Sequence, residues 1–495
     1  MRSFLSQQQP SFHKSCMVST LLIAFAALIN ISCGSGGQSS NMPPVLSGNT
    51  SVTLLLSSAA NGQLSDFRMT FNSLILTSKS GKTVNLLPGT QNVEFIHLNG
   101  SSEPLPAISI PQDIYTTATA KIGQAQFTCA AVKPTGGLVI ATYAYGATPD
   151  DHVSVALPAP ITVTGANMGL ALDMLVSKSA SLSACYNPNS SATYAITPTF
   201  NLTPVLFSSQ PTNSQNGQEA GLQGKVVSLN STDKTFTFFL VDGQTLKINT
   251  ANNTVYQGIN DFSGLGQNML VDMDAAIQPN GMLLATRMSV ADTDPTNLSV
   301  ANGPLLTTYA SEPALFSFGR QQQGFFSDTQ RASLMQAYSW DNATFQISGQ
   351  FTNLQNLPFV ASFNAANMFG GQNVYISTHA QTIAGGFPYS PATTLTLMPQ
   401  TVNGMITGVS TSGNFQVYSM ALADYDLPPT LVTQPGISYT LNSPKLVEVY
   451  VDSSTRMLNT QALSAGNVLR FNGLLFNDAG TLRMVSRQVN DGVPE

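Results

Sequence analysis

The stretch Gly266-Gln267-Asn268-Met269-Leu270-Val271-Asp272-Met273 recurs in altered form as Gly371-Gln372-Asn373-Val374-Tyr375-Ile376 and again as Gly466-Asn467-Val468-Leu469-Arg470-Phe471. Each copy is a glycine, then two residues, then apolar side chains at alternate positions. A period of two is typical of a β-strand with one buried face. The three glycines lie 105 and 95 residues apart, which predicts three related units over about the last 275 residues.

We expect the three repeated segments to occupy equivalent places in the three units. Within each segment the apolar side chains share one buried face, because alternate residues of a strand point the same way. The side chains predicted to point inward are Met269 and Val271, Val374 and Ile376, and Leu469 and Phe471.

The composition is typical of an exported β-protein. The chain has 495 residues, enough for several domains of roughly 100–200 residues each. Charged residues make up only 9%, against about 25% in an ordinary soluble domain, so Ser, Thr, Asn and Gln must supply much of the polar surface. The formal net charge of −6 and the pI of about 5.2 give no basic footprint for nucleic acid.

Residues 1–32 predict an export signal. Two positive charges precede an uncharged stretch that contains the apolar run 21–29. That run is short for a bilayer span and suits the core of a signal peptide. Ser32-Cys33 followed by Gly34-Ser35-Gly36-Gly37 resembles the cleavage box of bacterial lipoproteins, although Asn30 stands where that family usually has leucine. An uncleaved anchor or a plain secretory signal is the alternative.

The lipoprotein resemblance implies a lipid anchor. Cleavage before Cys33 makes this cysteine the lipid-modified N-terminus, and residues 33–48, rich in Gly, Ser, Asn and Pro, form a flexible tether. Gly34 is not the aspartate that retains many such proteins at the inner membrane. We therefore expect a lipid-anchored protein of the bacterial cell envelope, at the outer membrane or the cell surface.

Two cysteines remain beyond the predicted signal and lipid site. Cys129 and Cys185 fall in one predicted domain, and an exported protein meets an oxidising compartment. A Cys129–Cys185 disulfide is therefore expected, and two buried free cysteines are the alternative. No Cys or His lies nearby at metal-ligand spacing, so these cysteines predict no metal site.

Residues 49–206 predict a β-sandwich. Short apolar segments alternate with turn residues, and no long amphipathic helix interrupts them. In the segment 67–76, Phe67, Met69 and Phe71 fall on one face. The other predicted strands are 51–56, 83–87, 93–98, 117–122, 138–145, 153–157, 169–175 and 200–205. Residues 207–220 are mostly polar and form a linker.

The predicted sandwich resembles the bacterial domain-of-unknown-function family 4382. The resemblance rests on the order of the segments 73–76, 93–98, 110–115, 170–173 and 197–200. That family usually has Asp-Ala-Pro after its first strand, where Ser57-Ser58-Ala59 stands here, and a glycine before the tyrosine, where Asp113-Ile114 stands. The resemblance implies an exported β-sandwich, often carried by lipoproteins, and implies no chemistry.

Residues 221–296 predict the first of three small barrels. The segments 224–229 and 235–241 pair across a turn, and Asp242-Gly243 forms a hairpin turn into 244–248. These strands resemble domain-of-unknown-function family 5666, which implies a barrel of about five strands similar to an OB-fold.

Two further units complete the predicted architecture. Residues 403–493 repeat the plan of the first barrel, whereas residues 297–402 diverge from it. This middle unit carries a predicted insertion near 310–342 that includes Trp340. The expected fold is thus all-β, an N-terminal β-sandwich followed by three OB-like β-barrel repeats.

The sequence offers little catalytic material. Beyond the predicted signal, His97, His152 and His379 lie far apart, and the zinc-protease, nucleophile-elbow and Walker patterns do not occur. Two acidic segments, 150–152 and 292–297, have the oxygen ligands that suit a cation, but such loops are more often solvated. We predict no catalytic residue, no metal site and no cofactor.

The expected partners are the membrane and a glycan or an envelope protein. OB-like barrels that bind nucleic acid use basic grooves and stacking aromatics, and Arg470, Phe471, Arg483 and Arg487 could form a small basic face. The acidic chain and the export signal argue against it, so no nucleic-acid partner is predicted. The residues expected to hold a neutral polymer are exposed aromatics, with Trp340, Tyr375 and Tyr418 as candidates.

Two functions follow from these patterns. The favoured one is a non-enzymatic envelope lipoprotein that acts as a binding or scaffold module. The alternative is an enzyme or enzyme accessory that acts on an envelope polysaccharide or peptide polymer, which requires carboxylates that converge in a cleft.

Replacing Cys33 tests the predicted anchor. We expect Cys33→Ala to move the protein from the membrane fraction to soluble fractions, because two or three acyl chains anchor stably where one is marginal. Cell fractionation followed by immunoblotting measures the distribution. Membrane association that survives the substitution contradicts the lipoprotein interpretation.

Overall fold

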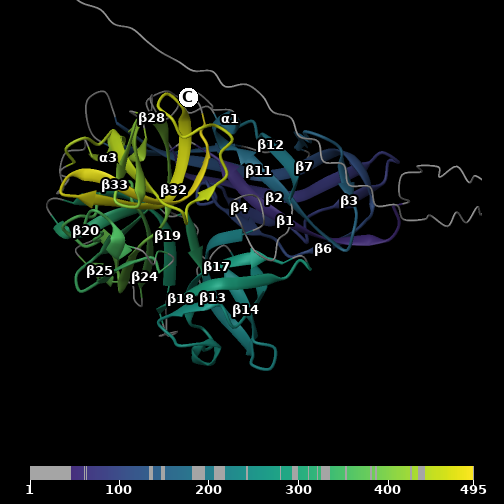
Figure 1. Cartoon of the computed structure of the whole chain (residues 1–495), viewed down its shortest axis with the longest axis horizontal. Helices are drawn as coiled ribbons and strands as arrows, with labels where there is room; N and C mark the ends of the chain where they lie inside the picture. Colours follow the sequence, from purple (N-terminus) through teal and green to yellow (C-terminus); the bar gives the residue numbers. More distant parts are fainter. Residues whose placement is uncertain are drawn as a thin grey trace, which may run out of the picture. The chain divides into compact units, whose positions relative to one another are not determined.

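The computed structural model (Figure 1) describes residues 46–60, 62, 64–132, 138–145, 151–180, 196–205, 218–240, 243–278, 280–292, 299–309, 312–319, 321–324, 335–349, 351, 354–378, 382–384, 387–423, 426–432 and 441–493. These residues are mostly in β-strands, so the prediction of an all-β protein is confirmed. None of the described helices is long and apolar enough to cross a membrane.

The first part of the described chain is two sheets. One sheet has the order β12-β11-β1-β5, with β6 also paired to β1, and β1 and β11 run parallel. Its strands are β1 (Asn49–Ala59), β5 (Ser102–Pro104), β6 (Ile108–Pro111), β11 (Asn167–Leu175) and β12 (Phe200–Val205). A short helix, α1 (Val176–Ser179), follows β11.

The second sheet has the order β10-β7-β2-β3, with β4 paired to β2 and with β8 and β9 paired to β7. Its strands are β2 (Leu64–Ser78), β3 (Thr83–Asn85), β4 (Gln91–Glu94), β7 (Asp113–Val132), β8 (Leu138–Tyr145), β9 (His152–Val155) and β10 (Ile161–Val163). The predicted strand 93–98 thus ends at Glu94, and a turn follows it.

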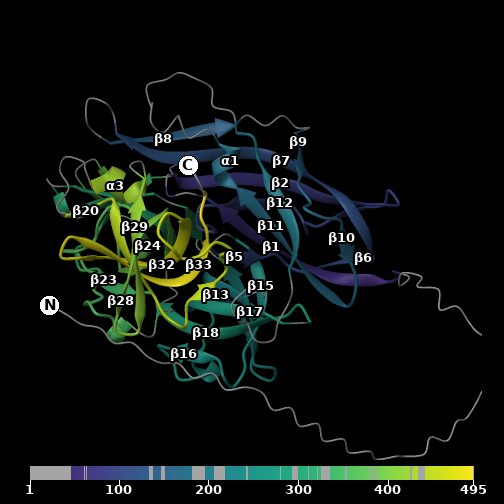
Figure 2. The same ribbon diagram turned by 45° about the horizontal axis from the view of Figure 1, so that its top comes forward.

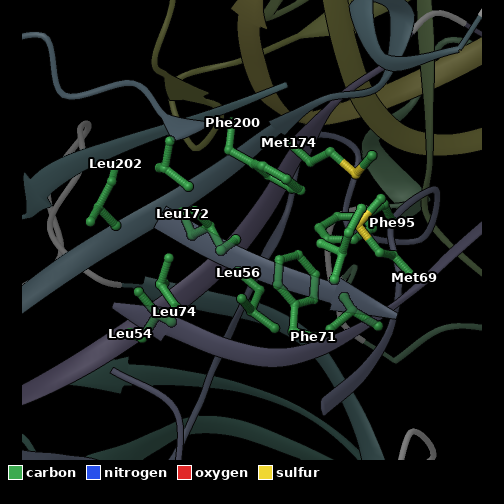
Figure 3. Close-up of a cluster of buried hydrophobic side chains, with 14 of the residues drawn as sticks. Leu54, Leu56, Met69, Phe71, Leu74, Phe95, Leu172, Met174, Phe200 and Leu202 are labelled. Atoms are coloured by element: carbon green, nitrogen blue, oxygen red, sulfur yellow. The ribbon is translucent and has the colours of Figure 1, made fainter. Parts of the chain in front are cut away.

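Apolar side chains from both sheets form one core (Figure 3). Phe71 of β2 packs edge-on against Phe200 of β12, with ring centroids 5.3 Å apart. Leu172 of β11 and Leu56 of β1 lie beside them (Figure 3). Two sheets packed face to face through alternate side chains are the arrangement of a β-sandwich.

A bulge changes which side chains of β2 face the core. Phe67, Met69 and Phe71 are buried, as the alternation predicts, but Leu74 and Leu76 are buried in the same core. The pairing of β2 with β7 shifts register on both sides of Phe71. An extra residue in one strand turns the following side chains to the other face.

Strand β1 is buried on both of its faces. Leu54 and Leu56 belong to the sandwich core, whereas Leu55 belongs to the core of the following barrel, with Ala171 and Val205 packed against it. Burial of both faces explains the unbroken apolar run of this strand.

A closed barrel follows the sandwich. Its sheet has the order β15-β14-β13-β17-β18, and parallel pairing of β15 with β18 closes the ring. The elements of this first barrel are β13 (Gln218–Asn230), β14 (Thr235–Leu240), β15 (Thr245–Asn249), β16 (Val255–Gln257), η1 (Phe262–Gly264), β17 (Leu270–Ile277) and β18 (Leu283–Asp292).

The last barrel has the same strand order. Its sheet runs β30-β29-β28-β32-β33-β31, and parallel pairing of β30 with β33 closes it as β15 and β18 close the first. Its elements are β28 (Gln400–Ser412), β29 (Phe415–Leu422), α3 (Leu427–Val432), β30 (Leu446–Val451), β31 (Arg456–Met457), β32 (Val468–Asp478) and β33 (Thr481–Asp491).

The middle unit keeps part of this plan. Its elements are β19 (Ser299–Tyr309), β20 (Glu312–Gly319), β21 (Gln322–Gly324), β22 (Met335–Ser339), β23 (Thr344–Ile347), η2 (Leu354–Asn356), β24 (Asn373–Thr378), β25 (Thr382–Ala384), β26 (Phe387–Pro391) and β27 (Thr394–Leu397).

The sheet of the middle unit departs from the barrel pattern at one place. Its order is β23-β27-β24-β19-β20-β22-β26-β25. The strands that match β22 are β15 in the first barrel and β30 in the last, and they close those barrels by pairing with β18 and β33. In the middle unit β22 pairs with β26 instead. The predicted insertion at 310–342 instead holds β20, β21 and β22, and β20 and β22 occupy the places of β14 and β15. The extra hairpin is β25–β26.

The repeated glycine segments are offset by two residues in the first barrel. Gly466 N donates to Ile406 O, and Gly371 N donates to Leu305 O in the same way. In the first barrel the donor to the matching carbonyl, Val226 O, is the backbone N–H of Asn268. Asn268 is therefore the counterpart of Gly371 and Gly466, and the alignment on Gly266 is wrong.

Backbone conformation explains the substitution of asparagine for glycine. Asn268, Gly371 and Gly466 have φ of 69°, 97° and 91°, and asparagine is among the residues that tolerate this left-handed region. Met269 consequently lies in the turn and is only partly buried. The other five residues predicted to point inward are all buried: Val271, Val374, Ile376, Leu469 and Phe471.

Substituting Gly404 tests the close strand approach that the barrels share. Gly224, Gly303 and Gly404 lie at matching positions, and a Cβ atom at any of them would overlap a backbone carbonyl of the neighbouring strand. We expect Gly404→Ala to lower the free energy of unfolding by about 1–3 kcal/mol. Calorimetry of the mature chain measures it. Gly89→Ala, where a Cβ meets nothing within 4 Å, is the control, and equal melting of both variants contradicts this explanation.

Candidate functional site

A polar cleft of about 250 Å³ lies between the first sheet of the sandwich and the last barrel. Figure 2 shows the strands involved, with β5 beside β33 and β1 nearby. One wall comes from β1, β5, β11 and β12 and the other from β31, β32 and β33. The polar lining includes Ser57, Ser102, Asp173, Arg456, Arg470 and Gln488.

Strand pairing places the polar groups of the first wall in one row. Ser57 of β1 pairs with Asp173 of β11 on one side and with Ser102 of β5 on the other. Leu55 and Ala171 lie two residues earlier and pair with each other in the row beside it. Because side chains alternate with a period of two, both rows face the same side of the sheet. That side is apolar beneath the first barrel and polar in the cleft.

Asp173 supplies the carboxylate of the cleft. Its Oδ1 accepts a hydrogen bond of 2.9 Å from Ser57 Oγ. Burial raises the pKa of Asp173 above its ordinary value, although the charge of Arg470 and the Ser57 hydrogen bond act in the opposite direction. Within the described part of the chain, Asp173 Oδ2 has no hydrogen-bond partner.

Arg470 supplies a guanidinium from the opposite wall. Its Nη1 donates to Asn99 Oδ1 at 2.7 Å and to Ser58 O at 3.1 Å, and its Nε donates to Asp491 O at 2.9 Å. Burial lowers the pKa of Arg470, and the negative charges of Asp173 and Asp491 raise it. No described residue accepts a hydrogen bond from its Nη2.

A tight turn of the sandwich carries these contacts. Asn99 is buried, and its side chain donates to Ala60 O at 3.0 Å, while its own carbonyl accepts from Thr401 Oγ1. Gly100 follows with a φ of 73°, and a Cβ there would come within 2.6 Å of Thr401 Oγ1. Gln488 Nε2 donates to Gly100 O at 2.6 Å. The turn and the last barrel are therefore held in one relative position.

A second buried polar group lies in the sandwich near this turn. His97 Nδ1 lies 3.0 Å from Glu94 Oε2, and its Nε2 lies 3.1 Å from Glu103 Oε1. Burial alone would lower the pKa of His97, but the charge of Glu103 and the hydrogen bonds to Glu103 and Glu94 raise it to about 10. His97 also lines a smaller cavity of about 70 Å³.

The predicted lipid and disulfide residues are only partly described. Cys33 and Cys185 lie outside the described residues. Cys129 is fully buried on β7 in the sandwich core. The lipidation and the Cys129–Cys185 disulfide therefore stay predictions.

The three candidate aromatics do not have the expected exposure. Tyr375 and Tyr418 are 5% and 7% exposed, and Tyr418 packs against Phe471 with ring centroids 5.9 Å apart. Trp340 is half-buried and stacks on Phe316 at 5.9 Å. The expectation of exposed aromatics is wrong for both tyrosines. Tyr418 belongs to the core of the last barrel, and Tyr375 faces a small cavity that residues of the first barrel also line.

The basic face considered for the last unit does not form. Arg470 is buried in the cleft wall, and Phe471 is in the barrel core. Arg487 is half-buried, and its Nη1 lies 3.9 Å from Asp274 Oδ1 of the first barrel. Arg483 pairs with Asp478 at 3.0 Å. Arg470 lines the cleft, Arg487 faces the first barrel and Arg483 pairs within the last barrel, so the three cations point to different places and share no face.

The remaining titratable candidates are scattered. His97 and His152 belong to different strands or turns of the sandwich, and His379 lies outside the described residues. Asp150, Asp294 and Asn297 of the two acidic segments also lie outside them. Within the described ranges, no three His, Cys, Asp or Glu side chains gather so that they could hold a metal ion. Glu94 and Glu103 flank the His97 ring on opposite sides and do not converge on a point.

Sequence reasoning overlooked Asp173 and Ser57 as site residues. Both interrupt apolar strands, in Leu170–Met174 and Leu54–Ser57, at positions that share a face with apolar neighbours. A carboxylate on such a face requires a polar partner. Its presence in an apolar strand is the signal in the sequence that indicates a polar site there. The cation whose charge acts on Asp173, Arg470, comes from a distant part of the chain, and the strand itself does not identify it.

Comparison with known proteins adds little beyond the first barrel. The family model described as "Domain of unknown function (DUF5666)" matches residues 223–289, which confirms the resemblance for that barrel. No curated protein matches the chain.

Two solved structures are similar to parts of the chain. A tryptophan-to-alanine variant of CusF with Cu(II), from Escherichia coli, is 15% identical, with 16% of this chain and 100% of that chain covered and a TM-score of 0.13. The wild-type single-stranded DNA binding protein from Thermus aquaticus is 11% identical, with 40% and 94% covered and a TM-score of 0.14. At these values neither similarity bears on what this chain binds.

The His97 cluster predicts a stability change that depends on pH. Removing the imidazolium leaves two buried carboxylates without their cation, which typically costs about 3–5 kcal/mol. We expect His97→Gln to lose about this much at pH 6, measured by urea unfolding. His152→Gln, at an exposed position on β9, is the control.

The sign of the pH effect follows from the raised pKa. His97 has a pKa of about 10 in the folded chain and about 6.5 unfolded, so its contribution is fully present below pH 6.5. The contribution declines by about 1.4 kcal/mol per pH unit above that and is lost as pH rises through 10. The wild type and His97→Gln should therefore converge toward high pH. A difference that is the same at pH 6 and pH 10 contradicts the protonated assignment.

Proposed function

We propose that the chain is a lipid-anchored protein of the bacterial cell envelope that binds or holds a ligand without converting it. The observation that carries the proposal is the polar cleft between two firmly joined parts of the protein, lined by hydroxyl, amide, carboxylate and guanidinium groups. A concave site with a few convergent polar groups is the usual form of a ligand site.

The sequence supports the location of the proposed function. The apolar run 21–29 and the segment Ser32–Gly37 support export and lipidation at Cys33, and residues 33–48 supply a tether. The resemblance of residues 49–206 to family 4382 supports the same interpretation. A Cys129–Cys185 disulfide would belong to an oxidising compartment. We place the protein at the outer membrane or the cell surface on these grounds.

The contacts between the parts support a scaffold role. Arg68 Nη2 of the sandwich donates to Gln321 O of the middle unit at 2.8 Å. Ser348 Oγ of the middle unit donates to Asp272 Oδ2 of the first barrel at 2.8 Å. Gln372 Nε2 donates to Leu475 O of the last barrel at 2.9 Å. The last two of these hydrogen bonds are buried and the first is partly buried, and together they hold the parts in fixed relative positions.

The chemistry of the cleft supports binding in preference to turnover. Hydrolysis of a glycoside usually needs two carboxyl groups about 5–10 Å apart, and Asp173 is the carboxylate among the described residues that line the cleft. One observation favours the alternative, an enzyme or enzyme accessory acting on an envelope polymer. The raised pKa of Asp173 is a property that general acids also have.

Screening the purified mature protein distinguishes the two functions. We expect it to bind an envelope glycan or an envelope protein and to leave chromogenic ester, glycoside and peptide substrates unchanged. Binding is measured on glycan arrays and by capture of outer-membrane proteins, and turnover by absorbance. Turnover that Asp173→Asn abolishes, with the melting temperature unchanged, contradicts the non-enzymatic proposal and supports the alternative.

A further inference from the structure

We propose that the cleft binds a neutral saccharide through adjacent hydroxyl groups, with Asp173 accepting a hydrogen bond from the sugar and Arg470 donating one to it. This inference rests on the proposed binding function and names the site and ligand class. It also assigns a role to a half-buried carboxylate and a buried guanidinium whose hydrogen-bonding capacity the packing of the protein does not fully use.

Each of the two groups retains hydrogen-bonding capacity in the cleft. Ser57 occupies Asp173 Oδ1, and among the residues described Oδ2 has no donor. The bonds of Arg470 to Ser58, Asn99 and Asp491 use Nε and Nη1, and Nη2 has no acceptor in the described part of the chain. Neither atom is enclosed in the protein, so water or a ligand can reach Oδ2 and Nη2 through the cleft.

The charges of the cleft favour a neutral ligand over an ion. An anion attracted by Arg470 meets the carboxylate of Asp173, and a cation attracted by Asp173 meets Arg470 and Arg456. A sugar hydroxyl avoids this conflict, because it can donate to a carboxylate and accept from a guanidinium at the same time. Vicinal hydroxyl groups repeat that pattern on neighbouring atoms.

The rest of the cleft also suits a sugar ring. Its volume of about 250 Å³ is just below the roughly 300–1,000 Å³ of drug-sized ligand sites, which suits a ligand as small as one sugar ring. The lining also includes the partly buried side chains of Ala171 and Val205, which can contact the C–H face of a ring where the cleft meets the first barrel. Gln488 and Asn490 supply amide groups at the edge. Few charges take part, so salt should weaken binding little.

The mature chain can be tested with defined sugars. The probes are methyl glycosides of glucose, galactose, mannose and N-acetylglucosamine with their disaccharides, and inorganic phosphate serves as the anionic probe. We expect at least one neutral sugar to bind by isothermal titration calorimetry and phosphate not to compete with it. Failure of all the sugars, or displacement by phosphate, overturns the inference.

Asp173→Asn tests the site. The change keeps the shape of the side chain but replaces a charged acceptor, and we expect affinity to fall on the order of 10- to 100-fold. Asp341→Asn, an exposed carboxylate on the middle unit, should leave affinity unchanged. An equal affinity of Asp173→Asn and wild type overturns the cleft assignment. The binding function itself would then stand, since sugar binding persists.

Ser57→Ala provides a second test that a purely structural role would not affect. The charged groups that face Asp173 across the cleft are Arg470 of β32 and Arg456 of β31, and Asp491 of β33 lies next to Arg470. The part of β12 that lines the cleft carries no charge. Sugar binding should fall as pH decreases through the raised pKa of Asp173. Because the Ser57 hydrogen bond favours the charged carboxylate, its loss should move this midpoint to higher pH. A pH profile with an unmoved midpoint shows that Asp173 does not contact the sugar.

The outcomes also separate this inference from the broader proposal. Capture of an envelope protein with no sugar binding overturns the saccharide site and leaves the binding function supported. Neither sugar binding nor protein capture contradicts both.

Discussion

The guanidinium of Arg470 fixes how the sandwich and the last barrel meet. Water solvates an exposed arginine from all sides, whereas the buried group has only the acceptors that the fold provides. Those acceptors are uncharged oxygens, and two of them, Ser58 O and Asn99 Oδ1, lie 412 and 371 residues away in the sequence. Since hydrogen bonds require defined distances and angles, β32 and the Asn99 turn have one compatible arrangement. The shape of the cleft follows from it.

The same principle joins the other parts of the protein. Only 9% of the residues are charged, so the chain can form few ion pairs on its surface. Several of its cations lie instead where two parts of the protein meet. Arg487 lies between the last and first barrels, beside Asp274, and Arg68 reaches the middle unit. At each junction separation would exchange an ion pair or hydrogen bond between the parts for contacts with water, and hydrogen bonds of charged groups favour the joined state by about 1.5–3 kcal/mol. Residues 46–495 accordingly form one compact unit.

Local patterns in the sequence predict the strands well and their registers poorly. The alternation at Val271–Met273 and Leu469–Phe471 identifies buried faces, because a strand has one period whatever its neighbours are. The offset of Asn268 against Gly371 depends on which residue adopts a positive φ, and both asparagine and glycine can do so. The bulge near Phe71 depends on pairing with β7, about fifty residues later. The hairpin β25–β26 likewise depends on strand pairs that local periodicity does not encode.

The candidate site shows the same division between local and distant information. Along β1, Leu55 and Ser57 face the same side of the sheet, yet one is apolar and the other polar. The difference corresponds to what covers each residue, the core of the first barrel over Leu55 and the cleft over Ser57. Composition along a strand therefore indicates where a covered face ends and an open one begins. The sequence of β1 does not show which residues form the opposite wall of the cleft. Arg470 in that wall belongs to the last barrel, which folds about its own core.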